Sequence, residues 1–356
     1  MVRDKIRILF SNFADSDNFN AQSLNAREIA LRLDPRRFHS TLFYEKKPDT
    51  RLLERLSIRL VQVPPRLGTS RMLVEALKGY DIIFRANMIP FTYLYLMVPE
   101  WLRRRTRIVD WLEGYDSCSD NEISPRWIKY SEFIQPRVNH RIGITEYIAR
   151  RHLEDRGLPS EGIIPVGVDT QFFVPSLPRS NDTPVVLYIG PLISRKNPQV
   201  VLMAARQFRN AQFVMVGEKR GSFHLRLKSL MKKWNLANVT IYDPMPQSDL
   251  VKLMHQSDIL FHPSRSEGLP KVVLEGAATG LPAVILDHYE APAVLDKVTG
   301  FQAKTIHELL SKLELLIEDQ SLRNRMGSAA VEHARQFDWD VVVNRWEKVF
   351  QRLAAS

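Results

Sequence analysis

Short apolar runs alternate with helical patterns along the whole chain, and this alternation constrains the fold more than any other feature. Runs that suit strands occur at residues 5–10, 41–44, 81–84, 107–111 and 141–144, and again at 184–190, 212–216, 239–242, 259–262 and 282–286. Strands that alternate with helices form parallel sheets covered on both faces. The sequence therefore predicts an α/β protein with two Rossmann-like, doubly wound domains.

The predicted division between the domains lies in residues 170–183, which are rich in Pro, Ser and Asn and have no helical periodicity. We expect an N-terminal domain at 1–170, a C-terminal domain at 171–337, and a final helix within 338–356 that packs back on the N-terminal domain. Open parallel sheets bind ligands beyond the carboxyl ends of their strands. Functional residues are therefore expected in loops that follow strands and face a cleft between the domains.

Composition excludes several other classes of protein. The single cysteine, Cys118, excludes an internal disulfide and a zinc site built on several cysteines. The apolar run at 8–10 is shorter than a signal-peptide core, and the stretch at 90–102 is too short to span a membrane, so a cytoplasmic protein is expected. The net charge of +10 suits an anionic ligand or surface, but the chain lacks the aromatic-basic motifs of nucleic-acid binders.

The most informative segment is HPSRSEGLPKVVLEGAATGLPAVIL, residues 262–286. Glu267 follows a strand, Pro270 suits the first turn of the next helix, and Glu275 falls in its second turn. Two carboxylates at this spacing suit the vicinal hydroxyls of a ribose or a hexose, and Gly268 lets a ligand approach the backbone. An exposed loop acid and an ordinary helix acid explain the spacing equally well.

A second segment, YIGPLISRKNP at residues 188–198, combines a strand end with two cations. Gly190 ends the strand, and Asn197 is expected to cap a helix that begins at Pro198. Arg195 and Lys196 precede this helix N-terminus, where positive charge and free N–H groups suit a diphosphate. A solvated basic turn is the alternative for this segment alone.

With these two segments the chain resembles the GT-B glycosyltransferases, specifically the large family 4 of retaining enzymes, also described as glycosyl transferases group 1. The resemblance is strongest over residues 163–350. There the recurrent family segments occur in order: IPVGVDTQFF, YIGPLISRKNP, FVMVGEK, DLVKLMHQSDILFHPS, SEGLPKVVLEGAATGLPAV, TGFQAK and FDWDVVVNRWEKVF. The N-terminal half is more loosely similar, with IGITEYIARRHLEDRG as its best match.

The resemblance implies transfer of a hexose-type sugar from a UDP- or GDP-sugar to a glycan, lipid-linked or small-molecule acceptor, with retention of configuration. It implies no metal or other cofactor, and a role in cell-surface polysaccharide biosynthesis. It assigns Glu267 to the donor sugar, Glu275 to the ribose, and Arg195 with Lys196 to the leaving diphosphate. The remaining donor-side positions that it implies are Gly190, Gly217, Gly268, Leu269 and Lys271.

Some positions depart from the family pattern. Pro191 stands where an arginine is common, so we expect Arg195 to supply that charge. Asn20 lies where the family has a pair of glycines, and Glu113 lies near the position of a common histidine. Both are assigned to the acceptor side, although a buried ion pair explains Glu113 equally well. These departures leave open a catalytically weak nucleotide-sugar-binding relative, and an epimerase-like GT-B enzyme is a further alternative with the same fold.

Three further features have structural interpretations that we prefer. The strings 15–17 and 338–340 are each Asp-X-Asp, but the first lies in a polar loop and Asp338 suits a helix cap, so no metal site is predicted. His262 suits a structural loop position better than a ligand contact. Residues 91–107 combine aromatics with four arginines and suit either a buried helix face, which is slightly favoured, or peripheral contact with the inner face of a membrane.

Overall fold

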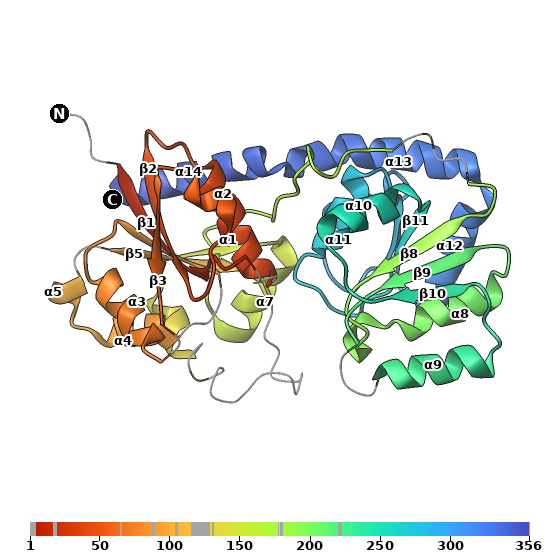
Figure 1. Cartoon of the computed structure of the whole chain (residues 1–356), viewed down its shortest axis with the longest axis horizontal. Coiled ribbons are helices and arrows are strands. Elements are labelled where there is room, and N and C mark those ends of the chain that lie inside the picture. The colour runs from red at the N-terminus through yellow and green to blue at the C-terminus, as the bar shows by residue number, and fades with distance from the viewer. Residues whose placement is uncertain are drawn as a thin grey trace. The chain divides into compact units, whose positions relative to one another are not determined.

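The computed structural model contains two compact units, each built on its own parallel sheet (Figure 1). It describes residues 5–355 except 17–19, 65, 87–89, 104–105, 115–128, 130–131, 177, 179–180 and 220–222. One unit comprises Met1–Val166 with Trp339–Ser356, and the other comprises Gly167–Asp338. The α/β fold with two Rossmann-like parallel-sheet domains, predicted from the sequence, is confirmed.

The N-terminal unit contains a seven-stranded sheet in the order β3-β2-β1-β4-β5-β6-β7. Its strands are β1 (Ile6–Phe13), β2 (Phe38–Tyr44), β3 (Ile58–Gln62), β4 (Ile82–Arg85), β5 (Arg107–Leu112), β6 (His140–Gly143) and β7 (Gly162–Ile163). All neighbouring strands pair in parallel, and the order reverses between β1 and β4. The carboxyl ends of β1 and β5 therefore lie at the same edge of the sheet.

Helices cover both faces of this sheet (Figure 1). They are α1 (Ala21–Arg32), α2 (Thr50–Leu53), α3 (Gly68–Ala76), α4 (Pro90–Met97), α5 (Glu100–Arg103), η1 (Gln135–Arg137), α7 (Glu146–Arg156) and α14 (Trp339–Ala355). The apolar side chains of α3 and α4 pack on one face, over Leu9, Ile83 and Ile108. The opposite face carries Phe10 and Phe84, whose ring centroids lie 5.2 Å apart.

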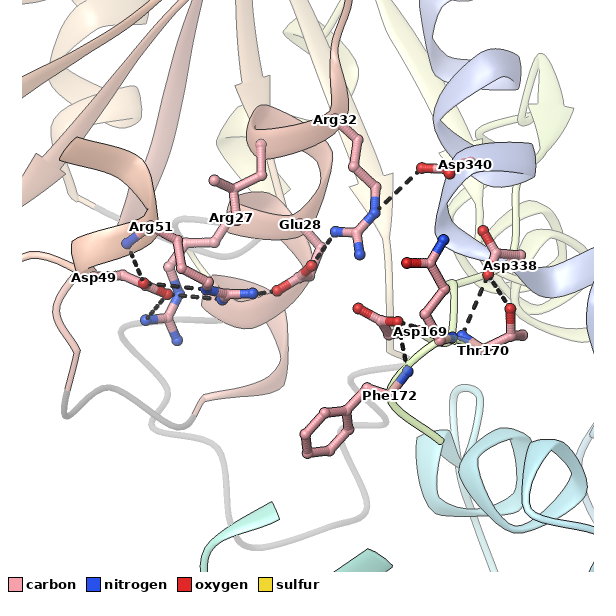
Figure 2. A network of polar contacts seen from close by, with 12 residues as sticks. Arg27, Glu28, Arg32, Asp49, Arg51, Asp169, Thr170, Phe172, Asp338 and Asp340 are labelled. Carbon is pink, nitrogen blue, oxygen red and sulfur yellow. Dashed lines mark hydrogen bonds and ion pairs between the residues drawn. The ribbon is translucent and has the colours of Figure 1, made fainter. Parts of the chain in front are cut away.

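The C-terminal helix α14 belongs to the N-terminal unit because its apolar face joins that opposite core. Phe84 packs edge-on against Trp346, with ring centroids 5.0 Å apart, and Phe38 packs against Phe350 at 6.3 Å. Polar contacts also tie α14 to α1, since Arg32 Nε lies 3.4 Å from Asp340 Oδ1 while the same guanidinium pairs with Glu28 (Figure 2). The final helix is thus fixed by both packing and charge.

The C-terminal unit contains a six-stranded parallel sheet in the order β10-β9-β8-β11-β12-β13. Its strands are β8 (Val185–Ile189), β9 (Gln212–Val216), β10 (Val239–Tyr242), β11 (Ile259–His262), β12 (Ala283–Leu286) and β13 (Gly300–Ala303). The order reverses between the neighbouring strands β8 and β11. Such a switch point is where open α/β sheets bind ligands.

The helical elements of this unit are η2 (Ser194–Lys196), α8 (Gln199–Gln207), α9 (Phe223–Lys233), α10 (Gln247–His255), α11 (Lys271–Ala278), α12 (Ile306–Glu318), α13 (Gln320–Ala334) and η3 (Arg335–Phe337). Residues of α8, α9 and α12 share one apolar core with the sheet, and α11 packs on β11 and β12. Gly276 makes the second contact possible, because a β-carbon there would lie only 2.8 Å from Leu260 Cδ2. Helix α11 is therefore held close against the strand that precedes the Glu267 loop.

Candidate functional site

The segments that follow β8 and β9 are in close backbone contact beside the switch point of the C-terminal unit. Gly190, which directly follows β8, donates its backbone N–H to Val216 O at 2.9 Å. A β-carbon on Gly217 would lie well within 3.0 Å of Gly190 O. Only glycine fits at position 217 without displacing this backbone. The predicted donor-side residues Gly190 and Gly217 are thus brought into direct contact.

The basic pair after β8 meets the acidic residue after β11. Lys196 Nζ donates a hydrogen bond to Glu267 Oε1, and Arg195 Nη1 lies 3.5 Å from Glu267 Oε2. Arg195 also donates to Ser266 O at 2.6 Å, and Arg265 N donates to Arg195 O at 3.0 Å. The three predicted catalytic residues are therefore gathered into one cluster, although 71 positions separate Lys196 from Glu267.

His262, the last residue of β11, is a further partner of Glu267. Its Nε2 lies 3.0 Å from Glu267 Oε1, and its side chain is almost fully buried. Burial opposes ionisation of Glu267, but the hydrogen bond from His262 and the charge of Lys196 outweigh it and hold the pKa of the carboxyl well below its usual value. Glu267 is therefore an anion at neutral pH despite being buried.

Glu275 lies in the second turn of α11 and differs from Glu267 in its surroundings. Its side chain is buried, and burial raises the pKa of its carboxyl, an effect that Lys271 partly opposes. At the start of α11, no side chain among the described residues caps the helix, and Pro270 occupies the N-cap position. Gly268, Leu269 and Lys271 are half-buried there. Uncapped N–H groups at a helix start suit an anion or an oxygen-rich ligand.

Asn197 does not cap α8 as predicted. It adopts the left-handed conformation with φ 56°, and α8 begins at Gln199 with Pro198 at the N-cap position. Asparagine tolerates this conformation because its short side chain bonds locally, here with Gln199. Asn197 therefore forms the turn that leads the backbone from η2 into α8.

The Asp-X-Asp strings have partners that explain them structurally. Asp15 accepts hydrogen bonds from the backbone N–H groups of Glu45 and Lys46 at 2.9 and 2.7 Å. Asp338 accepts from Thr170 N at 3.2 Å, which ties the end of its unit to the start (Figure 2). Asp17 lies outside the described residues, as does Cys118. Among the described residues no three His, Cys, Asp or Glu side chains cluster as metal ligands would.

The two residues assigned to the acceptor side have different surroundings. Asn20 is the N-cap of α1, since its Oδ1 accepts from Gln22 N at 2.9 Å. Glu113 follows β5, and its Oε2 accepts from Asn25 Nδ2 at 3.0 Å. This bond joins Glu113 to an amide on α1. Glu113 and Asn25 thus form a polar pair where β5 ends, while Asn20 serves the start of α1.

Asn12, in β1, was not predicted as a site residue. Its side chain is fully buried, and neither amide atom has a hydrogen-bond partner in the part of the chain that the structure describes. Asn25 Oδ1 and Ser11 Oγ are likewise buried and unpaired among those residues. Buried polar groups are normally bonded, so these unpaired atoms require a reason. The signal in the sequence was the polar pair Ser11-Asn12, which follows the apolar run Ile8–Phe10.

The stretch at 91–107 combines buried and exposed apolar residues. Phe91, Tyr95 and Leu96 form the buried side of α4, as the preferred interpretation expected. Met97, Trp101 and Leu102 are exposed, Trp101 by 79%. Arg104 and Arg105 lie outside the described residues. Among the residues that are described, no helix combines the length and the apolar character needed to cross a bilayer.

Comparison with known proteins gives a consistent picture. Residues 169–333 match the family described as Glycosyl transferases group 1. The chain is 28% identical over 219 residues to D-inositol 3-phosphate glycosyltransferase of Corynebacterium diphtheriae, which covers 55% of this chain and 51% of that protein. A second relative is the N,N'-diacetylbacillosaminyl-diphospho-undecaprenol alpha-1,3-N-acetylgalactosaminyltransferase of Campylobacter jejuni, with 29% identity over 174 residues. The aligned residues cover 48% of this chain and 45% of that protein.

Solved structures cover nearly the whole chain. A glycosyltransferase from Rickettsia africae superposes with a TM-score of 0.78 at 17% identity, over 98% of this chain and 99% of that one. Anabaena HepE in complex with UDP and glucose gives 0.78 at 19% identity, over 98% and 100%. At such identities the likeness shows the fold, which is GT-B. The chain spans about half the length of the curated relatives it matches.

Proposed function

We propose that this protein is a retaining glycosyltransferase that moves a hexose-type sugar from a nucleotide-diphosphate donor to a hydroxyl-bearing acceptor. The observation that carries the proposal is the contact of Arg195 and Lys196 with Glu267 at the switch point between β8 and β11. This cluster lies within the residues that match the glycosyltransferase family. Cations and a carboxylate held together at that edge suit a ligand that carries both phosphate and hydroxyl groups.

The donor would be held by three kinds of group. Lys196 and Arg195 would bind the diphosphate, Glu275 the ribose hydroxyls, and Glu267 a hydroxyl of the sugar. The N–H groups of Gly268, Leu269 and Lys271 would contribute around the phosphate. As the bond between the sugar and the diphosphate breaks, negative charge develops on the leaving group, and fixed cations stabilise that transition state. Two side-chain cations supply this charge, so we propose that no metal ion is needed.

A uridine diphosphate sugar is the donor to test first. Anabaena HepE, a protein with the same fold, has been crystallised in complex with UDP and glucose and in complex with UDP-glucose. A GDP-sugar is the second choice, because the described loops around Val216 and Tyr242 carry no feature that selects a base.

The acceptor is proposed to bind the N-terminal unit at the carboxyl ends of β1 and β5. Glu113, Asn25 and Asn12 provide carboxylate and amide groups there, and Asn12 is buried without a partner among the described residues. Such groups suit the hydroxyls of a sugar or cyclitol. The names of two relatives refer to an inositol phosphate and to an undecaprenol-linked sugar. A polyhydroxylated or lipid-linked acceptor in cell-surface glycan assembly is therefore our proposal.

Contact with a membrane surface is proposed to accompany a lipid-linked acceptor. The exposed side chains of Met97, Trp101 and Leu102 lie next to a basic segment of the sequence. Aromatic and aliphatic side chains beside arginines suit the interface of an anionic bilayer. We propose a cytoplasmic enzyme that binds peripherally to the inner face of the membrane through α4 and α5.

Thermal unfolding against UDP, GDP and ADP, each with EDTA present, tests the donor site. A ligand at about 100 times its dissociation constant that binds only the folded state adds roughly 2.7 kcal/mol to its stability. We expect one nucleotide to raise the Tm in EDTA, and Lys196→Ala to reduce the shift by about half or more, as a tenfold or greater loss of affinity would. A shift that requires a divalent metal would contradict the metal-free site, and no shift with any nucleotide would favour a non-catalytic relative.

Product analysis then separates transfer from the epimerase alternative. With the donor identified, incubation of the nucleotide sugar alone is followed by chromatography of the sugar. A GT-B epimerase converts the sugar without an acceptor, whereas the proposed transferase releases nucleotide diphosphate in proportion to added acceptor. The anomeric configuration of the product, read by NMR, tests retention.

A further inference from the structure

Within the described part of the chain, Glu267 has three hydrogen-bonding or ionic partners, and they differ in how firmly they are fixed. The side chains of Arg195, Lys196 and His262 are 35%, 14% and 1% exposed. The two cations lie on η2, a single short turn, whereas His262 belongs to β11, which pairs with both β8 and β12. His262 is therefore the partner with the least freedom to move.

Donor binding would act on these partners unequally. On the proposed function, Lys196 and Arg195 bind the diphosphate, and both then exchange part of their contact with Glu267 for phosphate oxygens. The neutral imidazole of His262 carries no charge that attracts the phosphate, and its position in β11 is fixed by strand pairing. The bond from His262 Nε2, 3.0 Å from Glu267 Oε1, is the one that can persist through this exchange.

The charge state of His262 fits that task. Burial lowers the pKa of the ring, and this effect, with smaller ones from Lys196 and Arg195, outweighs the contact with Glu267, which raises it. The ring is therefore neutral at pH 7. Because the ionised carboxylate only accepts, the neutral ring donates its Nε2 proton to it. A neutral donor orients Glu267 and leaves the carboxylate its full negative charge for a sugar hydroxyl.

The ring itself is confined. Tyr289, which follows β12, packs edge-on against it with ring centroids 6.4 Å apart at 88°. His262 Nδ1 is buried with no hydrogen-bond partner in the described part of the chain. An unpaired buried acceptor weakens a fold, so stability alone does not explain a histidine at this position.

We propose that His262 is a positioning residue that holds the Glu267 carboxylate in the orientation that binds the donor sugar while Lys196 and Arg195 engage the diphosphate. The proposal rests on the proposed function of Glu267. It replaces the structural interpretation that the sequence favoured for His262.

The test compares a nucleotide diphosphate with its sugar conjugate by calorimetry at pH 7.5. UDP and UDP-glucose are the probes, or GDP and GDP-mannose if guanine is the base that raises the Tm. The measured quantity is the ratio of the two dissociation constants, Kd(UDP)/Kd(UDP-glucose), which isolates the contribution of the sugar. In His262→Leu this ratio should fall about tenfold, the size of one hydrogen bond to a charged group, while Kd(UDP) stays within about twofold.

Conservative variants separate the hydrogen bond from packing. Glutamine places an N–H donor near the position of Nε2, so His262→Gln should keep the ratio within about threefold of wild type. Asparagine is shorter, so in His262→Asn the ratio should fall as it does in the leucine variant. If the leucine variant fails to fold, His262→Asn takes its place in the test. His333→Leu is the matched control, because His333 bonds a carbonyl, Pro292 O, in the same unit.

A double-mutant cycle with Glu267→Gln shows whether His262 acts through Glu267. If it does, His262→Leu should change the ratio little further once Glu267→Gln is present. A wild-type ratio in His262→Leu, or an equal loss in His262→Leu and His262→Gln, would overturn the proposal. If Glu267→Gln itself leaves the ratio unchanged, the proposed role of Glu267 fails, and that result is distinguishable from a failure of His262 alone.

Discussion

Gly217 lies so close to the carbonyl oxygen of Gly190 that a β-carbon on residue 217 would fall well within 3.0 Å of it. This contact fixes the ends of β8 and β9 relative to each other and so fixes the start of the segment that carries Arg195 and Lys196. We expect Gly217→Ala to lower the free energy of unfolding by about 2–3 kcal/mol, because backbone must move to admit the methyl group.

The same variant should weaken nucleotide binding, since the displaced backbone leads into the basic pair. Urea unfolding and UDP titration measure the two effects. Gly162→Ala is the control, because a β-carbon there meets Ile142 Cδ1 at an ordinary 3.8 Å. Its stability should stay within about 0.5 kcal/mol of wild type. A Gly217→Ala protein as stable as wild type would mean that the two loops are not locked in solution.

The basic pair gives a second prediction, which separates phosphate from nucleoside. Lys196→Met should weaken UDP binding about tenfold or more and leave uridine binding unchanged, because a charge-assisted bond to the diphosphate is lost. Calorimetric titration with UDP, UMP and uridine measures this. Lys252→Met is the control, since Lys252 pairs with Asp249 on the exposed side of α10 and should have no effect. Equal losses for uridine and UDP would instead indicate a collapsed site.

Glu275 gives a prediction on pH dependence. Burial raises the pKa of its carboxyl above the usual value near 4.5, so the ionised group weakens the fold above its folded-state pKa. The contribution of Glu275 to the free energy of unfolding should therefore rise as the pH falls through that pKa. Glu275→Gln removes the buried charge and should raise the Tm of the ligand-free protein at pH 8, with a gain that shrinks as the pH is lowered toward 4.5.

Nucleotide binding should change in the opposite direction. An amide replaces a charged acceptor for the ribose hydroxyls, so Glu275→Gln should weaken the binding of UDP by about tenfold. Tm measured from pH 8 to pH 5 with and without UDP checks both effects. A lower Tm for the ligand-free variant at pH 8 would show that the carboxylate makes a stabilising contact in the fold.

Much of this site was predictable because its residues lie in two short segments with characteristic spacing. Glu267, Glu275, Arg195 and Lys196 could each be named from the sequence. The contact of Arg195 and Lys196 with Glu267 could not, because it depends on the pairing of β8 with β11, whose residues are more than 70 positions apart. The bond from His262 depends on the same strand geometry, and residue type alone favoured an ordinary structural histidine.

The elements that the sequence missed were short or lacked an apolar pattern. Ten strands were expected at or near their positions, but β3, β7 and β13 were not. β7 has two residues, β13 begins with glycine, and β3 carries arginine and glutamine among its apolar residues. These strands form because neighbouring strands offer partners for their backbone groups, which is a property of the assembled sheet.

The exposed side chains of α4 and α5 give a prediction on membrane binding. Trp101→Ser should abolish or strongly reduce flotation with vesicles of phosphatidylglycerol and phosphatidylcholine, because Trp101 is the most exposed aromatic residue of that stretch. UDP binding should not change. Leu225→Ser, which alters an exposed apolar residue on α9, is the control. Flotation that persists in Trp101→Ser, or that is equally lost in Leu225→Ser, would contradict docking through α4 and α5.

Asn12 gives a prediction that needs no knowledge of the acceptor. Two amide atoms in a fully buried side chain, with no partner in the described part of the chain, weaken the fold, so a residue of similar shape without polar atoms should strengthen it. We expect Asn12→Leu to raise the free energy of unfolding by about 1–2 kcal/mol. The proposed acceptor role predicts that the same variant loses sugar transfer while it still binds UDP with wild-type affinity.

Asn238 is the matched control for this change. It is also buried, but its Nδ2 donates to the carbonyl oxygens of Ala205, Phe208 and Ala211 at 2.9–3.1 Å. Asn238→Leu leaves those acceptors unpaired and should lower the free energy of unfolding by about 2–3 kcal/mol. If Asn12 is retained for a ligand, urea unfolding should show that the free energy of unfolding rises in Asn12→Leu and falls in Asn238→Leu. A loss of stability in Asn12→Leu comparable to that in Asn238→Leu would show that Asn12 serves the fold, and the acceptor would then have to be sought around Glu113 and Asn25 alone.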